Sequence, residues 1–537
     1  MAISFGKLPR ALGTAGDKGQ SMETGLPQRL MHEGLFCSAE RFPHKIAVVA
    51  EGKEATYGEM AEMVENLSAF LQKQGVSRGD RCVIFMDNTL ACAVSIYAVL
   101  ATGAVFVVVN PQTKQDKLAY ILNDCQARVL ITDAHLHRVF VPALESAGSV
   151  SCVICSGDVA SLDQPDLVLF SDTVCAEGGT QENNTVIQKD LSALIYTSGS
   201  TGDPKGVMHT HLSMTFVLGS LIEYLRLSEH DRILLMLPLA FDYGLYQLFM
   251  SVQLGATLVM ERSFTYPAVI FERIRERDVT VFPAVPTIYA MLVSMHHRDP
   301  LCFPSVTRVT NTAAALPAGQ VPILKEIFPN ALIYKMYGLT ECKRVSYLEP
   351  ELIDVKPGSV GKAIPGTEVY VLDKQGIPVK PGETGMLHVR GTHLMLGYWG
   401  AAEISEKILV DAKLPGEKLL RTGDWFTIDE DGDLYFKGRS DDIIKTRGEK
   451  VSPLEVENVV IGIGGVREVA VIGTQDETLG QAIKCFVVLE QDCNLSMRDI
   501  RKACVEKLEN YMVPKYIEIV FSLPKTNTGK ICKRDLS

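Results

Sequence analysis

The chain has 537 residues, of which 47% are hydrophobic and 22% charged, and its formal net charge is −11. This length exceeds what one ordinary hydrophobic core organises, so two or more domains are expected. The composition excludes a disordered protein, and the negative charge argues against nucleic acid or an anionic membrane as the main partner.

The cysteines and the apolar stretches of the sequence indicate in which cellular compartment the protein is expected. Apart from Cys152 and Cys155, which form one CxxC in a strand-like run, the thirteen cysteines are scattered singly. A zinc site is therefore not indicated, and reduced core thiols predict a cytoplasmic protein. Residues 1–23 lack the apolar core of a signal peptide and are interpreted as a disordered tail. Gly103 divides the apolar stretch 90–109 into a helix-like and a strand-like half, so no transmembrane segment is predicted.

Helical and strand patterns alternate between residues 35 and 190. Helices are predicted at 57–74, from 89, and at 115–124, and strands at 81–86, 105–109 and 127–132. This alternation predicts a parallel sheet covered by helices. The same rhythm returns further along the chain and indicates a second α/β layer, packed on the first, with strands near 232–236, 257–260, 279–283 and 308–310.

From about Pro357 the chain changes to short strands with Gly and Pro turns, which predicts a small β subdomain at about 357–438. A charged stretch, GRSDDIIKTRGEK, then precedes a new β–α alternation. The predicted fold is α/β: a large N-terminal domain at 24–438, made of two packed α/β layers and the β subdomain, followed by a small α+β C-terminal domain at 439–537.

The most informative stretch is YTSGSTGDPKGV, at 196–207. It follows the apolar end of a predicted strand, and residues 197–206 hold four hydroxyls, three glycines, one proline and Lys205. Inward-turned glycine N–H groups, hydroxyl donors and a lysine suit phosphate binding. A flexible Ser/Gly linker is the alternative on composition alone. A Walker loop is excluded, because Lys205 lies between a proline and a glycine.

The stretch resembles the phosphate-loop signature of the adenylate-forming superfamily, which comprises acyl-CoA synthetases, peptide-synthetase adenylation domains and firefly-type luciferases. The resemblance spans roughly residues 35–534, and further motifs follow in the family's order: YGLTE at 337–341, TGD at 422–424, RGEKVSP at 447–453 and PKTNTGK at 524–530. It implies an AMP-forming acid–thiol ligase that uses ATP and Mg²⁺.

The resemblance also implies residue roles. An aromatic face at Tyr337 can stack on adenine, a carboxylate at Asp424 can accept from ribose hydroxyls, and Glu341 offers the hard oxygen that Mg²⁺ prefers. Catalytic roles fall on Lys530, Thr340, Glu341, His211 and Lys205. Nucleotide-binding roles fall on Thr197, Ser198, Gly199, Ser200, Thr201, Gly202, Lys205, Ala313, Ala314, Tyr337, Thr340, Asp424, Arg439 and Lys530, where Ala313 and Ala314 replace the family's usual glycines.

Two further positions match moving parts of the family. Asp441 matches its hinge, and Gly448 matches the place where a narrow pantetheine arm passes the backbone. The resemblance therefore implies a mobile C-terminal domain that swings between two half-reactions. The acceptor thiol is expected to belong to CoA or to the phosphopantetheine of a carrier protein acting in trans.

The segment FDYGLYQ, at 241–247, lies where the family recognises its acyl group. Asp242 stands where amino-acid-activating members anchor the substrate ammonium, so an amino acid or small polar acid is predicted. The partner of Asp242 would be that ammonium group or Arg344; alternatively, Asp242 caps a helix beginning at Tyr243. The expected pocket residues are Asp242, Tyr243, Tyr246, Met336 and Arg344. Alternative functions are a fatty or aryl acyl-CoA synthetase, a luciferase-like monooxygenase, or an inactive binding protein.

Overall fold

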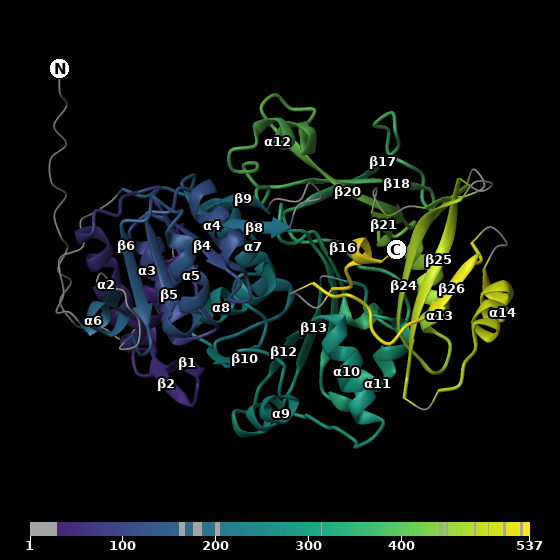
Figure 1. The fold of residues 1–537 in the computed structure, drawn as a ribbon, viewed down its shortest axis with the longest axis horizontal. Coiled ribbons are helices and arrows are strands. Elements are labelled where there is room, and N and C mark those ends of the chain that lie inside the picture. The colour runs from purple at the N-terminus through teal and green to yellow at the C-terminus, as the bar shows by residue number, and fades with distance from the viewer. Residues whose placement is uncertain are drawn as a thin grey trace, which may run out of the picture.

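The computed structural model describes residues 29–159, 167–175, 185–198, 204–312, 314–439, 442, 444–446, 449–476, 480–491, 493–508, 512–526 and 530–536. The predicted tail at 1–23 lies outside them. Within them, four sheets are arranged along the molecule (Figure 1), two covered by helices and two smaller ones built from later residues.

The first sheet has seven strands in the order β7-β6-β5-β3-β4-β8-β9. All its pairings are parallel except β8 with β9. Its strands are β3 (Arg81–Phe85), β4 (Val105–Val109), β5 (Val129–Asp133), β6 (Cys152–Ser156), β7 (Leu167–Leu169), β8 (Leu191–Ser198) and β9 (Pro204–Thr210). The helices of this region are α2 (Tyr57–Lys73), α3 (Leu90–Ala101), α4 (Gln115–Asp124), α5 (His137–Leu144) and α6 (Phe170–Cys175).

The second sheet has nine strands in the order β16-β15-β14-β13-β12-β10-β11-β1-β2. They are β1 (Ile46–Ala50), β2 (Lys53–Thr56), β10 (Arg232–Leu235), β11 (Thr257–Met260), β12 (Val281–Ala284), β13 (Arg308–Asn311), β14 (Leu332–Tyr337), β15 (Ser346–Leu348) and β16 (Lys362–Ala363). Its helices are α1 (Glu33–Arg41), α7 (His211–Tyr224), α8 (Asp242–Leu254), α9 (Pro267–Glu276), α10 (Pro286–His296) and α11 (Val321–Ile327). One hydrophobic core joins both sheets through α2, α3, α7 and α8.

Local signals account for these helices. Thr56 and Glu59 form a reciprocal capping box at the start of α2, and Thr89 accepts a hydrogen bond from the Cys92 N–H at the start of α3. Helix α3 is buried on nearly all sides and leads into the wholly buried β4. This confirms that the apolar stretch 90–109 is a buried helix and strand, and no described helix is long and apolar enough to cross a membrane.

The phosphate-loop prediction needs one correction. Residues 197–206 were expected to form a loop after a short strand, but Thr197 pairs with Lys205 and Ser198 with Pro204 in an antiparallel ladder. Lys205 therefore lies in strand β9, and residues 199–203 lie outside the described residues.

The third and fourth sheets are smaller. The third contains β17 (Glu368–Leu372), β18 (Thr384–Arg390), β19 (Leu409–Asp411), β20 (Lys418–Ile428) and β21 (Leu434–Arg439), with helix α12 (Ala402–Ile408) beside it. The fourth contains β22 (Ile444–Thr446), β23 (Glu449–Val451), β24 (Val466–Asp476), β25 (Gly480–Leu489) and β26 (Tyr516–Ile519), with helices α13 (Pro453–Ile461) and α14 (Met497–Lys507). Short 3₁₀ turns lie at 134–136, 318–320, 350–352 and 533–535.

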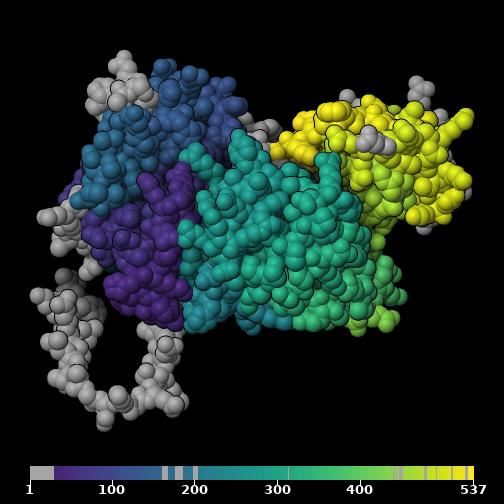
Figure 2. Space-filling model, turned by 90° about the horizontal axis from the view of Figure 1, so that it is seen from below, coloured from purple at the N-terminus to yellow at the C-terminus, as the bar shows by residue number. Residues whose placement is uncertain are grey.

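The residues of the fourth sheet have hydrophobic clusters of their own, and Figure 2 shows them as a separate yellow lobe at one end of the molecule. The expected boundary at 438/439 falls at the end of β21, whose last residue still pairs with β20 in the third sheet. Strand β16, inside the expected β subdomain, pairs with β15 in the second sheet. The domain limits themselves stay a prediction.

Candidate active site

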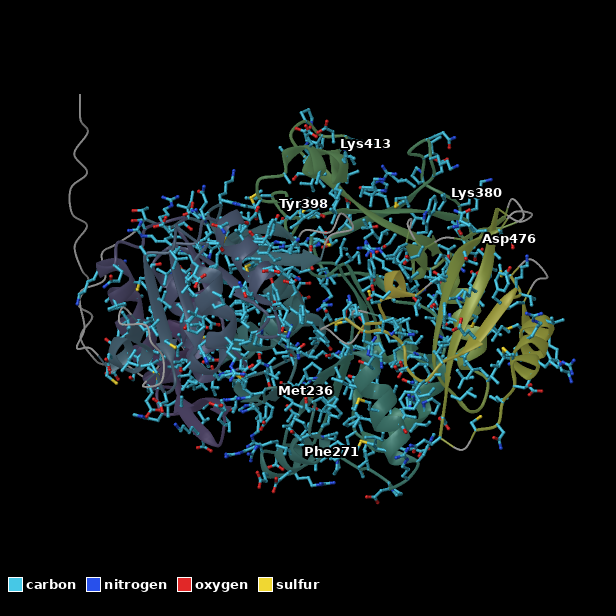
Figure 3. All side chains as sticks on the ribbon, in the orientation of Figure 1. Met236, Phe271, Lys380, Tyr398, Lys413 and Asp476 are labelled. Atoms are coloured by element: carbon cyan, nitrogen blue, oxygen red, sulfur yellow. The ribbon has the colours of Figure 1, made fainter. Side chains whose placement is uncertain are left out.

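Strands β8 and β9 form a hairpin, which we call the phosphate hairpin. Residues 395–399 lie along it and form hydrogen bonds with strand β9. The Trp399 N–H donates to the Gly206 carbonyl (2.8 Å), and the Met208 N–H donates to the Gly397 carbonyl (3.0 Å). A Cβ at Gly206 would lie 3.3 Å from the Cβ of Trp399, so glycine permits this close approach. The Lys205 ammonium lies 5.7 Å from the centre of the Tyr398 ring. Figure 3 labels Tyr398 in this region, between α12 and the hairpin.

The YGLTE motif forms the turn between β14 and β15. A Cβ at Gly338 would lie 2.3 Å from the Lys343 carbonyl oxygen, so only glycine allows the turn to close. Glu341 accepts a hydrogen bond from the Tyr398 hydroxyl (2.6 Å), and its carbonyl accepts from the Met395 N–H (2.8 Å). The motif's glutamate is therefore fixed by the same segment that supports the phosphate hairpin.

A buried histidine connects the hairpin with this turn. His209, in β9, donates from Nε2 to the Thr340 carbonyl at 2.8 Å. Burial lowers the pKa of His209 well below its ordinary value, and the positive charge of Lys343 adds to the lowering. The ring is accordingly neutral with its proton on Nε2, and it serves to position Thr340.

Tyr337, Asp424 and Arg439 come together although they are far apart in the sequence. The Tyr337 hydroxyl donates to Asp424 Oδ2 (2.5 Å), and Arg439 Nε lies 3.3 Å from Asp424 Oδ1. Asp424 is only 6% exposed, and among the described residues its Oδ1 accepts no hydrogen bond. Burial raises the pKa of Asp424, while Arg439 and Tyr337 oppose that change. A fixed carboxylate whose Oδ1 accepts no hydrogen bond from these residues suits a ribose hydroxyl.

Lys530 reaches the same place from the C-terminal lobe. Its backbone N–H donates to Thr526 Oγ1 (3.2 Å), which fixes the end of the PKTNTGK motif. Its side chain keeps contact with solvent, yet partial removal from water lowers its pKa; the positive charge of Arg439 adds to the lowering, and Asp424 opposes it. Lys530 therefore lies within electrostatic range of the residues expected at the ribose and phosphates.

His211 does not lie where the sequence analysis expected it. It begins α7 and is wholly buried, and its Nδ1 accepts a hydrogen bond from the Met31 N–H (3.1 Å). Its ring packs edge-on against His32, and burial lowers its pKa to about 3. A neutral, enclosed ring has no route to a phosphate, so the expected catalytic role is replaced by a structural one.

Several expected residues lie outside the described residues: Gly199, Ser200, Thr201, Gly202, Ala313, Asp441 and Gly448, together with the side chain of Ser198. Ala314 is described and exposed, and its carbonyl accepts from Asn311 Nδ2 (3.1 Å).

The expected acyl-pocket residues do converge. Tyr243 and Tyr246, from α8, and Met336, from β14, are all buried. The guanidinium of Arg344 lies 5.6 Å from the centre of the Tyr243 ring. Helix α8, strand β14 and the β14–β15 turn thus contribute to one buried cluster.

The partner of Asp242 is a residue that the sequence analysis missed. Lys343 Nζ lies 3.0 Å from Asp242 Oδ1, and the lysine side chain is 1% exposed. Lys343 has φ of 64°, a left-handed conformation unusual for a lysine. The prediction that the protein's partner would be Arg344 is therefore wrong. The helix-cap alternative is also wrong, because Phe241 is the N-cap of α8 and no side chain caps it.

The other missed residues are His209, Tyr398 and Trp399. These residues hold the recognised motifs in place, and their spacing in the sequence does not indicate this role. A cavity of about 530 Å³ lies elsewhere, lined by residues that include Lys53, Asp133 and His135, and it contains none of the site residues.

The geometry fits the groups that the family binds. Asp424 retains an acceptor for ribose, Lys205 and Lys530 supply positive charge for phosphates, and Glu341 forms no ion pair with a described residue, which leaves its carboxylate for Mg²⁺. These contacts fit a nucleotide-dependent enzyme, with the candidate site where the C-terminal lobe meets the rest of the chain.

Comparison with known proteins also indicates a nucleotide-dependent enzyme. The family model described as AMP-binding enzyme matches residues 35–399, and that of the AMP-binding enzyme C-terminal domain matches residues 455–530. The chain is similar to the long-chain-fatty-acid–CoA ligase of Bacillus subtilis (29% identical, covering 96% of this chain and 95% of the relative). It is also similar to tyrocidine synthase 1 of Brevibacillus parabrevis (27%, covering 94% and 44%).

Solved structures give the same result. The anthranilate CoA ligase AuaEII in complex with anthranoyl-AMP superposes with a TM-score of 0.86 at 29% identity, covering 94% of this chain and 95% of that one. A benzoate CoA ligase from Burkholderia xenovorans LB400 superposes with a TM-score of 0.84 at 28% identity, covering 94% and 99%. The chain belongs to the AMP-binding enzyme family, and it is an ATP-dependent, AMP-forming acid–thiol ligase.

Proposed function

We propose that this enzyme activates a carboxylic acid other than an α-amino acid as its acyl adenylate and transfers the acyl group to CoA. The observation that carries the proposal is the Asp242–Lys343 ion pair of 3.0 Å. A half-buried carboxylate already neutralised by a buried lysine has no charge left for a substrate ammonium. The amino-acid substrate favoured by the sequence is therefore not retained.

In the first half-reaction an oxygen of the substrate carboxylate attacks the α-phosphorus of ATP, and the bond to pyrophosphate breaks. Positive charge from Lys205 and Lys530 stabilises the charge on the phosphates as the adenylyl group is transferred, and Asp424 orients the ribose. Glu341, held by Tyr398, would bind Mg²⁺, which neutralises charge on the phosphates.

In the second half-reaction a thiolate sulfur bonds to the acyl carbon, and AMP leaves with the electron pair of the broken C–O bond. We propose that the C-terminal lobe turns about Asp441 between the steps, so that Lys530 withdraws and Gly448 admits the pantetheine arm. CoA is favoured as the acceptor because several of the similar proteins are CoA ligases.

The test is ATP–pyrophosphate exchange against a panel of carboxylic and amino acids, followed by thiol consumption with CoA or with a phosphopantetheinylated carrier protein. We expect exchange with carboxylic acids and loss of free thiol with CoA. Exchange driven only by amino acids would refute the substrate proposal, and transfer only to the carrier would refute the acceptor.

A further inference from the structure

Arg344 is a buried arginine without an acidic partner. It is 4% exposed, and no carboxylate of the described residues forms an ion pair with it within 4.0 Å. Nη1 donates to Thr312 Oγ1 at 2.8 Å, and the buried Nε has no hydrogen-bond partner among those residues. A guanidinium offers five donors, so most of its capacity remains unused.

Another arginine of this chain shows the usual solution. Arg308, on the neighbouring β13, pairs with Asp231 at 2.8 Å and also donates to the carbonyls of Leu225 and Arg226. Removing a guanidinium from water is costly unless such partners compensate it. Arg344 lacks such partners among the described residues, as is expected of a side chain that binds a ligand.

Among the described residues, no acidic side chain of the acyl cluster is left to neutralise Arg344. Asp242 is committed to Lys343, the Tyr243 hydroxyl donates to the Thr310 carbonyl (2.5 Å), and the Tyr224 hydroxyl points to the Met336 sulfur (2.9 Å). With Asp242 and Lys343 cancelling, the cluster carries one uncompensated positive charge. The Tyr243 ring below the guanidinium stabilises the cation but cannot neutralise it.

We propose that the acid substrate carries a second carboxylate, which pairs with Arg344 while the first one reacts. This rests on the proposed function, since it takes the cluster of Tyr243, Tyr246 and Met336 as the acyl pocket. Arg344 and Glu341 belong to the same turn, so a dicarboxylic acid would be held at its far end by the residue three positions after the one that binds Mg²⁺. The planar fork of arginine matches a carboxylate bidentately.

The experiment compares matched acids of equal carbon number: succinate with butyrate, glutarate with pentanoate, adipate with hexanoate, and phthalate with benzoate. The kcat/KM of ATP–pyrophosphate exchange is measured for wild type, Arg344→Met, Arg344→Lys and the control Arg273→Met. Arg273 lies on α9 and pairs with Glu261 at 2.9 Å, away from the cluster.

We expect wild type and Arg273→Met to prefer the dicarboxylic member of at least one pair by about thirtyfold or more, the effect of one buried charge pair. Arg344→Met should lose that preference, and Arg344→Lys should retain part of it. The KM for ATP should stay unchanged in both Arg344 variants, which a general loss of structure would not permit.

Three results would overturn the inference. A wild type that activates monocarboxylic acids and discriminates against every dicarboxylic partner would refute it while leaving the proposed function intact, and needs no folded variant. An Arg344→Met enzyme that loses both members of each pair alike, with a raised KM for ATP, would assign Arg344 to the nucleotide. If wild type neither binds ATP nor exchanges pyrophosphate with any acid, the proposed function itself is wrong.

Discussion

The turn between β14 and β15 has two sides that differ in how their charges are balanced. On the nucleotide side, Tyr337 and Glu341 are each tied by one hydroxyl–carboxylate hydrogen bond, to Asp424 and from Tyr398 respectively. On the acyl side, Lys343 is paired with Asp242, and Arg344 forms no ion pair with any acid in the described part of the chain. The residues of the nucleotide side are held in place for the nucleotide. On the acyl side, the positive charge of Arg344 has no described counter-charge.

The nucleotide side therefore serves the reaction, and the acyl side determines which acid is bound. The nucleotide is the same for every member of the family, so its contacts are carried by recognisable motifs. The acyl group is recognised by residues whose charge must complement the charge of the substrate. A single unpaired arginine therefore changes the class of acid that is bound. The variants below test the two sides separately.

The largest effect is expected from Lys530→Ala. Loss of one charge-stabilising donor should reduce adenylate formation by about 10²–10³-fold. Transfer to thiol from supplied acyl-AMP should be retained. Because the pKa of Lys530 is lowered, its protonated form is lost as pH rises through that lowered value, so adenylation should decline at a lower pH than an ordinary lysine would impose.

The control for Lys530 is Lys525→Ala in the same motif, whose ammonium pairs with Glu468 at 2.9 Å. It should leave adenylation nearly unchanged. Pyrophosphate exchange and single-turnover thioester formation, each measured across pH, check the prediction. Equal losses in both half-reactions would contradict the assignment of Lys530 to adenylation.

The acyl side is tested next through stability. Lys343→Met leaves Asp242 without its partner and should lower the free energy of unfolding by about 3 kcal/mol. Asp242→Asn combined with Lys343→Met should recover much of that loss. Urea unfolding of the full chain gives the comparison, and the exposed pair Lys418–Asp411 supplies a control, Lys418→Met, expected to cost about 0–1 kcal/mol. Additive losses in the double variant would show that the pair is not coupled.

A smaller effect is expected from Asp424→Asn. The amide keeps the size of the side chain but removes the charge that ribose hydroxyls and Arg439 meet, so kcat/KM for ATP should fall about tenfold to a hundredfold. The kcat/KM of the acid, at saturating ATP, should change far less. Asp411→Asn, at the exposed end of strand β19, is the matched control. Unaltered ATP kinetics would remove Asp424 from the ribose site.

The alternation of strands and helices could be read from the sequence because buried parallel strands such as 105–109 are unbroken apolar runs. Their order in the sheets could not, since it depends on contacts between distant segments. The hairpin β8–β9 was missed for a related reason: Ser, Thr, Gly and Pro are typical of loops, and here a ladder with register Thr197–Lys205 overrides that preference.

Within the site, the motif residues Tyr337, Glu341, Asp424 and Lys530 could be named from the sequence because they stand in motifs of the family, and their roles stay predictions. The partner of Asp242 was not. A lysine after YGLTEC is ordinarily a surface residue, and only its left-handed backbone directs it into the core. His211 shows the opposite error, since a histidine next to a phosphate loop invites a catalytic role that its burial excludes.

The smallest effect is expected from Tyr398→Phe, which removes only the hydroxyl that donates to Glu341 at 2.6 Å. Because Glu341 stays in place but is held less firmly, kcat/KM for ATP should fall by about threefold to tenfold, less than a fully buried charged hydrogen bond would cost. The Mg²⁺ concentration for half-maximal pyrophosphate exchange should rise in parallel, since the carboxylate proposed to bind the ion is no longer oriented. Tyr370→Phe is the matched control, because Tyr370 donates to Glu368 at 2.8 Å on an exposed strand. If Tyr398→Phe lowers activity at every Mg²⁺ concentration by the same factor, the hydroxyl serves the packing of the hairpin and not the metal-binding carboxylate. If the two phenylalanine variants are indistinguishable, the hydrogen bond to Glu341 has no part in nucleotide binding.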